Sequence, residues 1–147
     1  MKAGKYDISV DQGSTFVFYL TYQDSAGVAI DLDGDTVRMQ VRRSAIDTDL
    51  ILDISNTGGV TGGGSTGEYS SGGGSLGHNY SGITLNASSA GATGTTVGIY
   101  IKIDSDTMAN VPTGNHLYDL ELVTGTDVDK ILKGRFEVEG EITRWKF

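Results

Sequence analysis

Apolar and polar residues alternate with a period of two along much of this chain. Over Thr36–Arg43 every second residue is apolar, and two arginines, Arg38 and Arg42, occupy polar positions between them. A strand places successive side chains on opposite faces, whereas a helix of 3.6 residues per turn would scatter this pattern around its axis. The segment therefore predicts a strand buried on one face, with Arg38 and Arg42 facing solvent or a partner.

Other stretches bring the expected number of strands to about eight. They are Lys5–Val10, Ser14–Tyr22, Val28–Leu32, Leu50–Ile54, Thr96–Ile103, Leu117–Val123 and Gly134–Glu139. Only Ser105–Asn110 is typical of a short helical turn, with Ser105 as its expected N-cap. An all-β fold follows, and about eight short strands pack as a sandwich or a small barrel.

Turn residues separate the expected strands. They occur at Asp24–Gly27, Asp33-Gly34, Pro112–Asn115 and Thr124–Asp127. Glycine, asparagine and aspartate accept a positive φ and proline fixes φ, so these positions predict tight connections, several of them hairpins.

A glycine- and serine-rich insertion at Thr57–Gly94 interrupts this pattern. It holds most of the 22 glycines, and Glu68 is its only charged residue. One interpretation is a mobile excursion between core strands, because so little apolar surface cannot offset the entropy of ordering the backbone. The other is a segment that orders against neighbouring subunits, in which Ile83–Asn86 adds a strand. Its expected anchors are Tyr69, Leu76, Tyr80, Ile83 and Leu85.

Length and charge narrow the classes of function. The 147 residues predict a single domain over 1–147, with the insertion at 57–94 inside it. A net charge of −8 makes nucleic acid and anionic membranes poor partners. No apolar run is long enough to cross a bilayer, the N-terminus lacks the apolar core of a signal peptide, and the absence of cysteine excludes disulfides and thiolate sites.

Candidate catalytic and metal-binding residues are few. His78 and His116 stand apart from other residues suited to metal ligation or general base catalysis, and both are expected to be ordinary polar residues. The acidic run Asp31–Asp35 has oxygen ligands that suit Ca²⁺, but it departs from the EF-hand loop, and Asp33-Gly34 favours a turn. No serine hydrolase or phosphate-binding motif is present, so we expect a protein that is not an enzyme and needs no cofactor.

The C-terminal segment ends in aromatic and basic residues. Arg144 and Trp145 follow the last expected strand. Two interpretations stand side by side: the terminal aromatic residues cap the core, or Arg144 and Trp145 insert into a neighbouring molecule as docking anchors.

Two parts of the chain resemble short structural proteins of tailed bacteriophages. The first is Tyr6–Arg42, with Asp11–Phe16, Asp24–Gly27, Asp31–Gly34 and Thr36–Arg42; the second is Leu117–Arg144, with Tyr118–Leu122, Ile131–Val138 and Glu141–Arg144. These segments are similar to the N-terminal domain of baseplate upper proteins and to the last strands of related virion proteins. The shared motifs are mostly hairpin and turn residues that many β proteins have in common. The glycine-rich insertion departs from the pattern of these virion proteins.

The resemblance implies an immunoglobulin-like antiparallel β-sandwich that acts in the virion as a non-catalytic adaptor of the tail, baseplate or neck. Its implied partners are other virion proteins and copies of itself, in a symmetric homo-oligomeric assembly. Arg38, Arg42, Arg144, Trp145 and the Thr57–Gly94 insertion are the expected contact residues. Two alternatives stay open: a capsid decoration or head-fibre protein, and a carbohydrate- or surface-binding module with Tyr69 and Tyr80 as its sugar platform.

Overall fold

The computed structural model describes residues 4–44, 46, 50–57, 59–62, 65–68, 82–88 and 98–140. Within these ranges the chain forms eleven strands and one short helix. The strands are β1 (Gly4–Lys5), β2 (Ile8–Asp11), β3 (Phe16–Thr21), β4 (Thr36–Arg42), β5 (Leu50–Ser55), β6 (Gly59–Gly62), β7 (Ser65–Glu68), β8 (Gly82–Ala87), β9 (Gly98–Ile103), β10 (Gly114–Thr124) and β11 (Asp127–Glu139). The helix is α1 (Ser105–Ala109).

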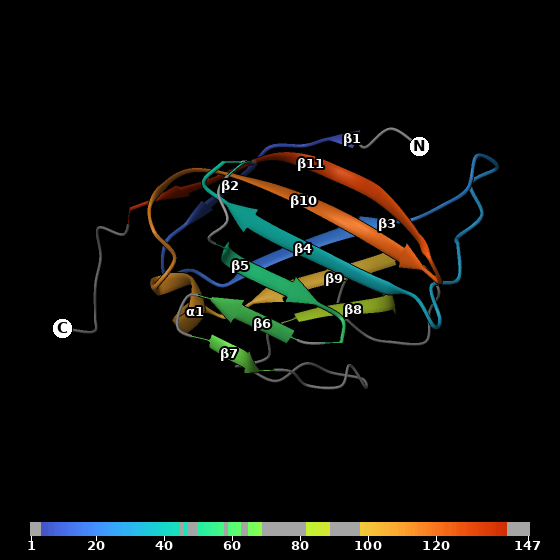
Figure 1. Cartoon of the computed structure of the whole chain (residues 1–147), viewed down its shortest axis with the longest axis horizontal. Coiled ribbons are helices and arrows are strands. Elements are labelled where there is room, and N and C mark those ends of the chain that lie inside the picture. The colour runs from blue at the N-terminus through green and yellow to red at the C-terminus, as the bar shows by residue number, and fades with distance from the viewer. Residues whose placement is uncertain are drawn as a thin grey trace.

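The strands form two sheets that face each other. The larger sheet has the order β1-β11-β10-β4-β5-β6-β7, and β2 follows β1 along the same edge of β11. The smaller sheet has the order β3-β9-β8 and is antiparallel throughout. Figure 1 shows β3, β9 and β8 behind β4, β5 and β6. The fold is a β-sandwich, as the alternating sequence predicts.

The strand order is that of a variable-type immunoglobulin domain. In such a domain strands G, F, C, C′ and C″ form one sheet, and strands B, E and D lie in the other. Here β11, β10, β4, β5 and β6 take the first set of places, and β3, β9 and β8 take the second. β1 and β2 pair with β11 in parallel, so the sheet is antiparallel except at this edge. The predicted immunoglobulin-like sandwich is confirmed.

The core lies between the inward faces of the two sheets. Val37, Met39 and Val41 of β4 are fully or almost fully buried, and so are Ile99, Ile101 and Ile103 of β9. Each aliphatic side chain removed from water in this way contributes roughly 1.5–3 kcal/mol to stability. The alternation seen in the sequence is therefore the alternation between core and outer surface.

Aromatic packing joins the sheets near one end. The ring of Phe16 on β3 meets the ring of Phe136 on β11 edge-on, with centroids 5.6 Å apart. Tyr118 on β10 packs against the same Phe136 ring at 6.5 Å. Antibody domains connect strands B and F by a disulfide, but this chain has no cysteine. Apolar contacts therefore hold the two sheets together.

Three predicted elements need correction. Lys5–Val10 is not one strand, because Tyr6 and Asp7 separate β1 from β2. Val28–Leu32 is not a strand: it contributes one isolated bridge, Ala29 to Gln23, and Val28 is 60% exposed. The reason is local, because the Asp24 carboxylate accepts hydrogen bonds from the backbone N–H groups of Ala26 and Val28 and curls the chain into a turn. Likewise, the N-cap of α1 is Asp104 and not Ser105, since Asp104 Oδ1 accepts from the Thr107 N–H at 2.8 Å.

Three strands lie within the glycine-rich insertion. β6 and β7 extend the larger sheet beyond β5, and β8 completes the smaller sheet. The added strand expected at Ile83–Asn86 is therefore confirmed, with Ile83 buried and Leu85 packed against the core. A mobile excursion is the wrong interpretation for these three strands. Of the expected anchors, Tyr69, Leu76 and Tyr80 lie outside the described residues.

The predicted tight turns are present. Gly27, Gly34, Gly114 and Gly125 all have a positive φ. Gly125 and Thr126 link β10 to β11, because Thr124 pairs with Asp127 across the hairpin. In the described part of the chain, no helix has the length and apolar character needed to cross a membrane.

Candidate functional site

The outer face of the larger sheet carries a regular grid of charged side chains. Gln40 of β4, Asp119 of β10 and Lys133 of β11 lie side by side, because Asp119 is the register partner of both. The neighbouring rows are Arg42–Leu117–Arg135 and Arg38–Glu121–Lys130. The positions on β4 and β10 alternate with core residues, so the buried inner face fixes where these outer side chains stand. On β11 the register shifts between Lys130 and Leu132, and this shift brings both Lys130 and Lys133 into the grid.

The edge of the grid is built by the passage from β1 to β2. Lys5 pairs with Lys133, which brings a further cation to the row. The Tyr6 N–H then donates to the Lys133 carbonyl at 3.0 Å, and the Asp7 carboxylate accepts from the Arg135 N–H at 3.0 Å. These bonds hold the β1–β2 connection against β11.

Gly134 permits this close approach. A Cβ at residue 134 would clash with the carbonyl oxygen of Tyr6, which is a backbone atom. Tyr118, the register partner of Gly134, donates its hydroxyl to the same carbonyl at 2.6 Å. Burial, with the nearby Asp7 carboxylate and Tyr6, raises the pKa of Tyr118 to about 12. The phenol is therefore neutral and available as a donor.

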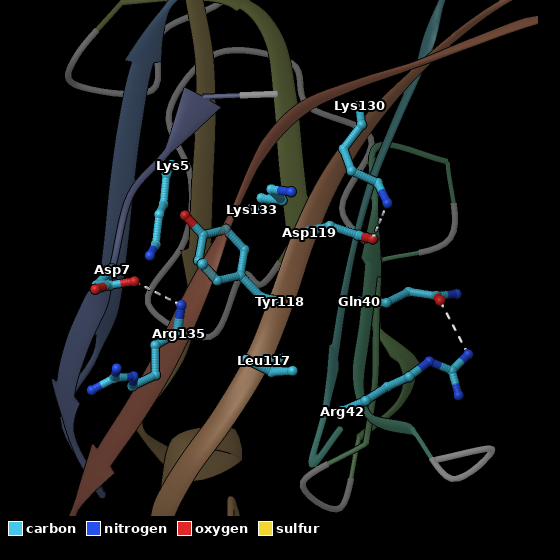
Figure 2. Close-up of a pocket in the computed structure, with 11 residues that line it drawn as sticks. Lys5, Asp7, Gln40, Arg42, Leu117, Tyr118, Asp119, Lys130, Lys133 and Arg135 are labelled. Carbon is cyan, nitrogen blue, oxygen red and sulfur yellow. Dashed lines mark hydrogen bonds and ion pairs between the residues drawn. The ribbon is translucent and has the colours of Figure 1, made fainter. Parts of the chain in front are cut away.

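These elements enclose a hollow of about 390 Å³ on the outer face. We call it the basic hollow; Figure 2 shows its lining residues, which come from β1, β4, β10, β11 and the β1–β2 connection. They are Lys5, Asp7, Gln40, Arg42, Leu117, Tyr118, Asp119, Lys130, Lys133, Gly134 and Arg135. Five of them are basic and two are acidic, in a chain whose net charge is −8. The hollow thus reverses the charge of the molecule locally.

Some of these charges are already paired. Lys130 contacts the Asp119 carboxylate at 3.1 Å, and Arg42 donates to Gln40 at 3.2 Å. At the side of the hollow, Arg38 contacts Glu121 at 2.9 Å. Both ion pairs are partly exposed, so each contributes at most about 1 kcal/mol to stability.

Three cations in the hollow have no such partner. Among the described residues, no carboxylate oxygen lies within ion-pair distance of the side chains of Lys5, Lys133 or Arg135. Lys5 and Lys133 are register neighbours, and Lys133 and Arg135 share one face of β11. Like charges held this close repel one another, so an anionic group that enters the hollow relieves the repulsion.

The hollow also exposes one apolar side chain. Leu117 is 44% exposed and is the register partner of both Arg42 and Arg135. An exposed leucine flanked by arginines offers apolar contact area and hydrogen-bond donors to the same partner. This combination is typical of protein interfaces, in which arginine is enriched.

The residues singled out from the sequence divide into two groups. Arg38 and Arg42 lie on the outer face as predicted, Arg42 in the wall of the hollow and Arg38 beside it. Tyr69, Tyr80, Arg144 and Trp145 lie outside the described residues, so their expected roles stay predictions.

The expected turn at Asp31–Asp35 is confirmed. The Asp35 N–H donates to the Leu32 carbonyl at 3.0 Å, and Gly34 has a φ of 84°. The Asp31 carboxylate accepts from the Asp33 N–H and from Asn86 Nδ2, which lowers the pKa of Asp31. Across the described ranges, no group of three or more His, Asp or Glu side chains is arranged to hold a metal ion.

The two histidines were expected to be ordinary polar residues. His116 is fully buried at the start of β10, and its Nε2 lies 2.7 Å from the Pro112 carbonyl oxygen, to which it donates. No described residue makes a hydrogen bond with its Nδ1. The side chain thus closes the connection from α1 to β10. His78 lies outside the described residues.

Sequence reasoning missed most of the hollow. Lys5, Lys130, Lys133 and Arg135 were not singled out, although Lys133 and Arg135 stand two residues apart, as the residues of one strand face do. That spacing was the available signal. The sequence does not reveal which strands pair or in which register, and the register brings these cations together.

Comparisons with known proteins give a distant likeness. No family model matches the chain, and no curated protein matches its sequence. Among solved structures, the chain is similar to an extracellular fragment of Novel Immune-Type Receptor 11 from Ictalurus punctatus that includes the stalk region. The identity is 11% and the TM-score 0.41, over 98% of this chain and 90% of that one.

Proposed function

We propose that this chain is a non-enzymatic structural adaptor that holds neighbouring proteins through the outer face of its larger sheet. The observation that carries the proposal is the basic hollow, where paired strands hold an exposed leucine near three cations that pair with no carboxylate in the described part of the chain. Charges that the fold already holds in place around an apolar contact favour docking of a protein surface. Binding then loses little conformational entropy, because few side chains and little backbone have to be ordered.

The lining of the hollow supports docking over catalysis. None of its eleven lining residues is a serine, histidine or cysteine. The Asp119 carboxylate is paired with Lys130, and the Asp7 carboxylate accepts from the Arg135 N–H. The lining therefore lacks the usual partnership of a nucleophile with an oriented base.

The setting that we propose is the virion of a tailed bacteriophage, in its tail, baseplate or neck. The support is the resemblance of Tyr6–Arg42 and Leu117–Arg144 to short virion proteins. These two segments supply β2, β3, β4, most of β10 and all of β11, and so most of the face that carries the hollow. In a symmetric particle, many copies of one modest contact add up to stable attachment.

The experiment is substitution within the hollow in the phage that encodes the chain. Leu117→Asp places a carboxylate at the centre of the proposed interface. We expect the amount of this variant chain in purified particles, measured by mass spectrometry, to be at least about tenfold lower than that of the wild type. The matched control is Val17→Asp, an equally exposed valine on the smaller sheet. Normal incorporation of Leu117→Asp, or absence of the wild-type chain from particles, would contradict the proposal. The copy number distinguishes a tail or neck position from the capsid.

A further inference from the structure

A second charged surface lies at one end of the sandwich. We call it the acidic end; it consists of Asp24, Asp31, Asp33 and Asp35 in the β3–β4 connection and Asp127 and Asp129 at the start of β11. The segments 22–36 and 124–129 contain no lysine or arginine. The basic hollow and the acidic end are therefore of opposite charge.

The two segments of the acidic end lie close together. β4 begins where β10 ends, because Thr36 pairs with Val123, and this register places Asp35 beside the β10–β11 hairpin. Both Asp35 and Asp129 act electrostatically on Tyr22. Figure 1 shows the β3–β4 connection and the hairpin at the same end of the molecule.

Most of these carboxylates are available to a partner. In Asp24 and in Asp31, one carboxylate oxygen accepts a hydrogen bond from a backbone N–H group of the same turn. The side chains of Asp33, Asp35, Asp127 and Asp129 make no hydrogen bond or ion pair with any described residue. Four unpaired carboxylates on one surface thus match three unpaired cations on another.

The acidic end cannot reach the unpaired cations in the hollow of its own molecule. Lys133 and Asp127 lie on the same strand, six positions apart, which is roughly 20 Å in an extended backbone. β11 is paired with β10 from Asp127 to Val138, so it does not fold back on itself. Contact between the acidic end and these cations therefore requires two molecules.

We propose that the basic hollow of one molecule binds the acidic end of a second copy of this chain. This inference rests on the proposed docking role of the hollow and names its occupant. The two surfaces differ, so the contact is heterologous: each copy uses its hollow for one neighbour and its acidic end for another. Such head-to-tail contacts close into a ring or extend as a filament, as a repeated structural protein requires.

The experiment measures self-association of the purified full chain by sedimentation velocity. We expect oligomers at about 0.05 M salt, and a dissociation constant at least about tenfold weaker at about 0.5 M salt, because exposed charge pairs are screened. The hollow variant Lys133→Glu with Arg135→Glu and the end variant Asp33→Lys with Asp127→Lys should each be monomeric. The hollow variant makes the chain more negative, and the end variant makes it less negative. A general effect of net charge on association would therefore have opposite signs in the two variants.

A mixture of the two variants provides the decisive control. The hollow variant keeps a native acidic end, and the end variant keeps a native hollow, so an equimolar mixture should associate again. Restored association also shows that both variants are folded. Lys102→Glu, a reversal on β9 of the smaller sheet, should leave association unchanged.

The remaining outcomes separate this inference from the proposed function. A wild-type chain that is monomeric at low salt overturns self-docking. If the hollow variant is then also lost from phage particles, the occupant of the hollow is an acidic surface of another virion protein, and the adaptor role stands. If that variant enters particles normally, both proposals fail. Association that survives both reversals likewise rejects the hollow and the acidic end as the contact.

Discussion

The hydroxyl of Tyr118 donates a hydrogen bond of 2.6 Å to the backbone carbonyl of Tyr6, 112 positions earlier in the chain. The bond ties the β1–β2 connection to the middle of β10, behind the basic hollow. We expect Tyr118→Phe to lower the free energy of unfolding by about 1–2 kcal/mol, because a partly buried carbonyl loses its donor while the ring still packs on Phe136. Denaturant unfolding measures the change, and stability equal to wild type would contradict it.

The same phenol gives the fold a stability that depends on alkaline pH. The pKa of Tyr118 is raised to about 12 in the folded chain, whereas an unfolded tyrosine ionises near pH 10. Between these values the folded state holds a proton that the unfolded state has lost. The free energy of unfolding therefore falls as pH rises from about 10 to 12, by up to about 2 kcal/mol.

The Tyr118→Phe variant is the control for this pH effect. Its unfolding free energy should fall less steeply over the same interval, because the residue that titrates is gone. Unfolding by urea at several pH values from about 9 to 12 makes the comparison. Parallel pH profiles for the variant and the wild type would show that Tyr118 does not carry the effect.

At position 134 even the smallest side chain should lower the free energy of unfolding. In Gly134→Ala the new Cβ meets the Tyr6 carbonyl, which is backbone and cannot rotate away. We expect a loss of about 1–3 kcal/mol, together with displacement of the β1–β2 connection from β11. Gly140→Ala is the matched control, since its Cβ finds only Thr113 at an ordinary 3.7 Å. Equal stability of the two variants would show that the approach of Tyr6 to β11 is not this close.

Asn86 holds the turn of the acidic end against β8. It is the only residue other than glycine with a positive φ in the described part of the chain, at 51°. Its Oδ1 accepts from the Leu32 N–H at 3.0 Å, and its Nδ2 donates to Asp31 at 2.9 Å. Asn86→Gly and Asn86→Ala both remove these bonds, but only alanine is strained at this φ. We expect both variants to be destabilised, alanine by about 1 kcal/mol more than glycine; thermal unfolding that ranks them in reverse would contradict this account.

Much of the sandwich follows from local sequence pattern, and the reason is visible in β4 and β9. Both strands face the core on one side only, so their alternation survives in the sequence as apolar residues at every second position. Val28–Leu32 shows the limit of the rule. Its apolar residues alternate too, but the Asp24 carboxylate bonds the backbone into a turn.

The candidate site followed from the sequence only in part, because pairing register is a long-range property. Arg38 and Arg42 could be placed on an outer face from their own strand alone. Lys5 and Lys133 belong to opposite ends of the chain, and only the parallel pairing of β1 with β11 makes them neighbours. β6 could not be predicted from its own sequence, because its glycine-rich residues do not alternate between apolar and polar. Pairing with β5 makes it a strand.

The contact between Phe16 and Phe136 gives a last prediction, because it joins the two sheets in a chain that has no disulfide. An edge-on aromatic pair contributes about 0.5–1.5 kcal/mol beyond the apolar area that it buries. We expect a double-mutant cycle of Phe16→Leu and Phe136→Leu, followed by urea unfolding, to show a coupling energy in this range. The same cycle with Phe16→Leu and Val128→Ala should be additive, since Val128 is 51% exposed at the far end of β11. Additivity in both cycles would mean that the two rings contribute nothing beyond the apolar area that they bury. The aliphatic core alone would then keep the sheets together.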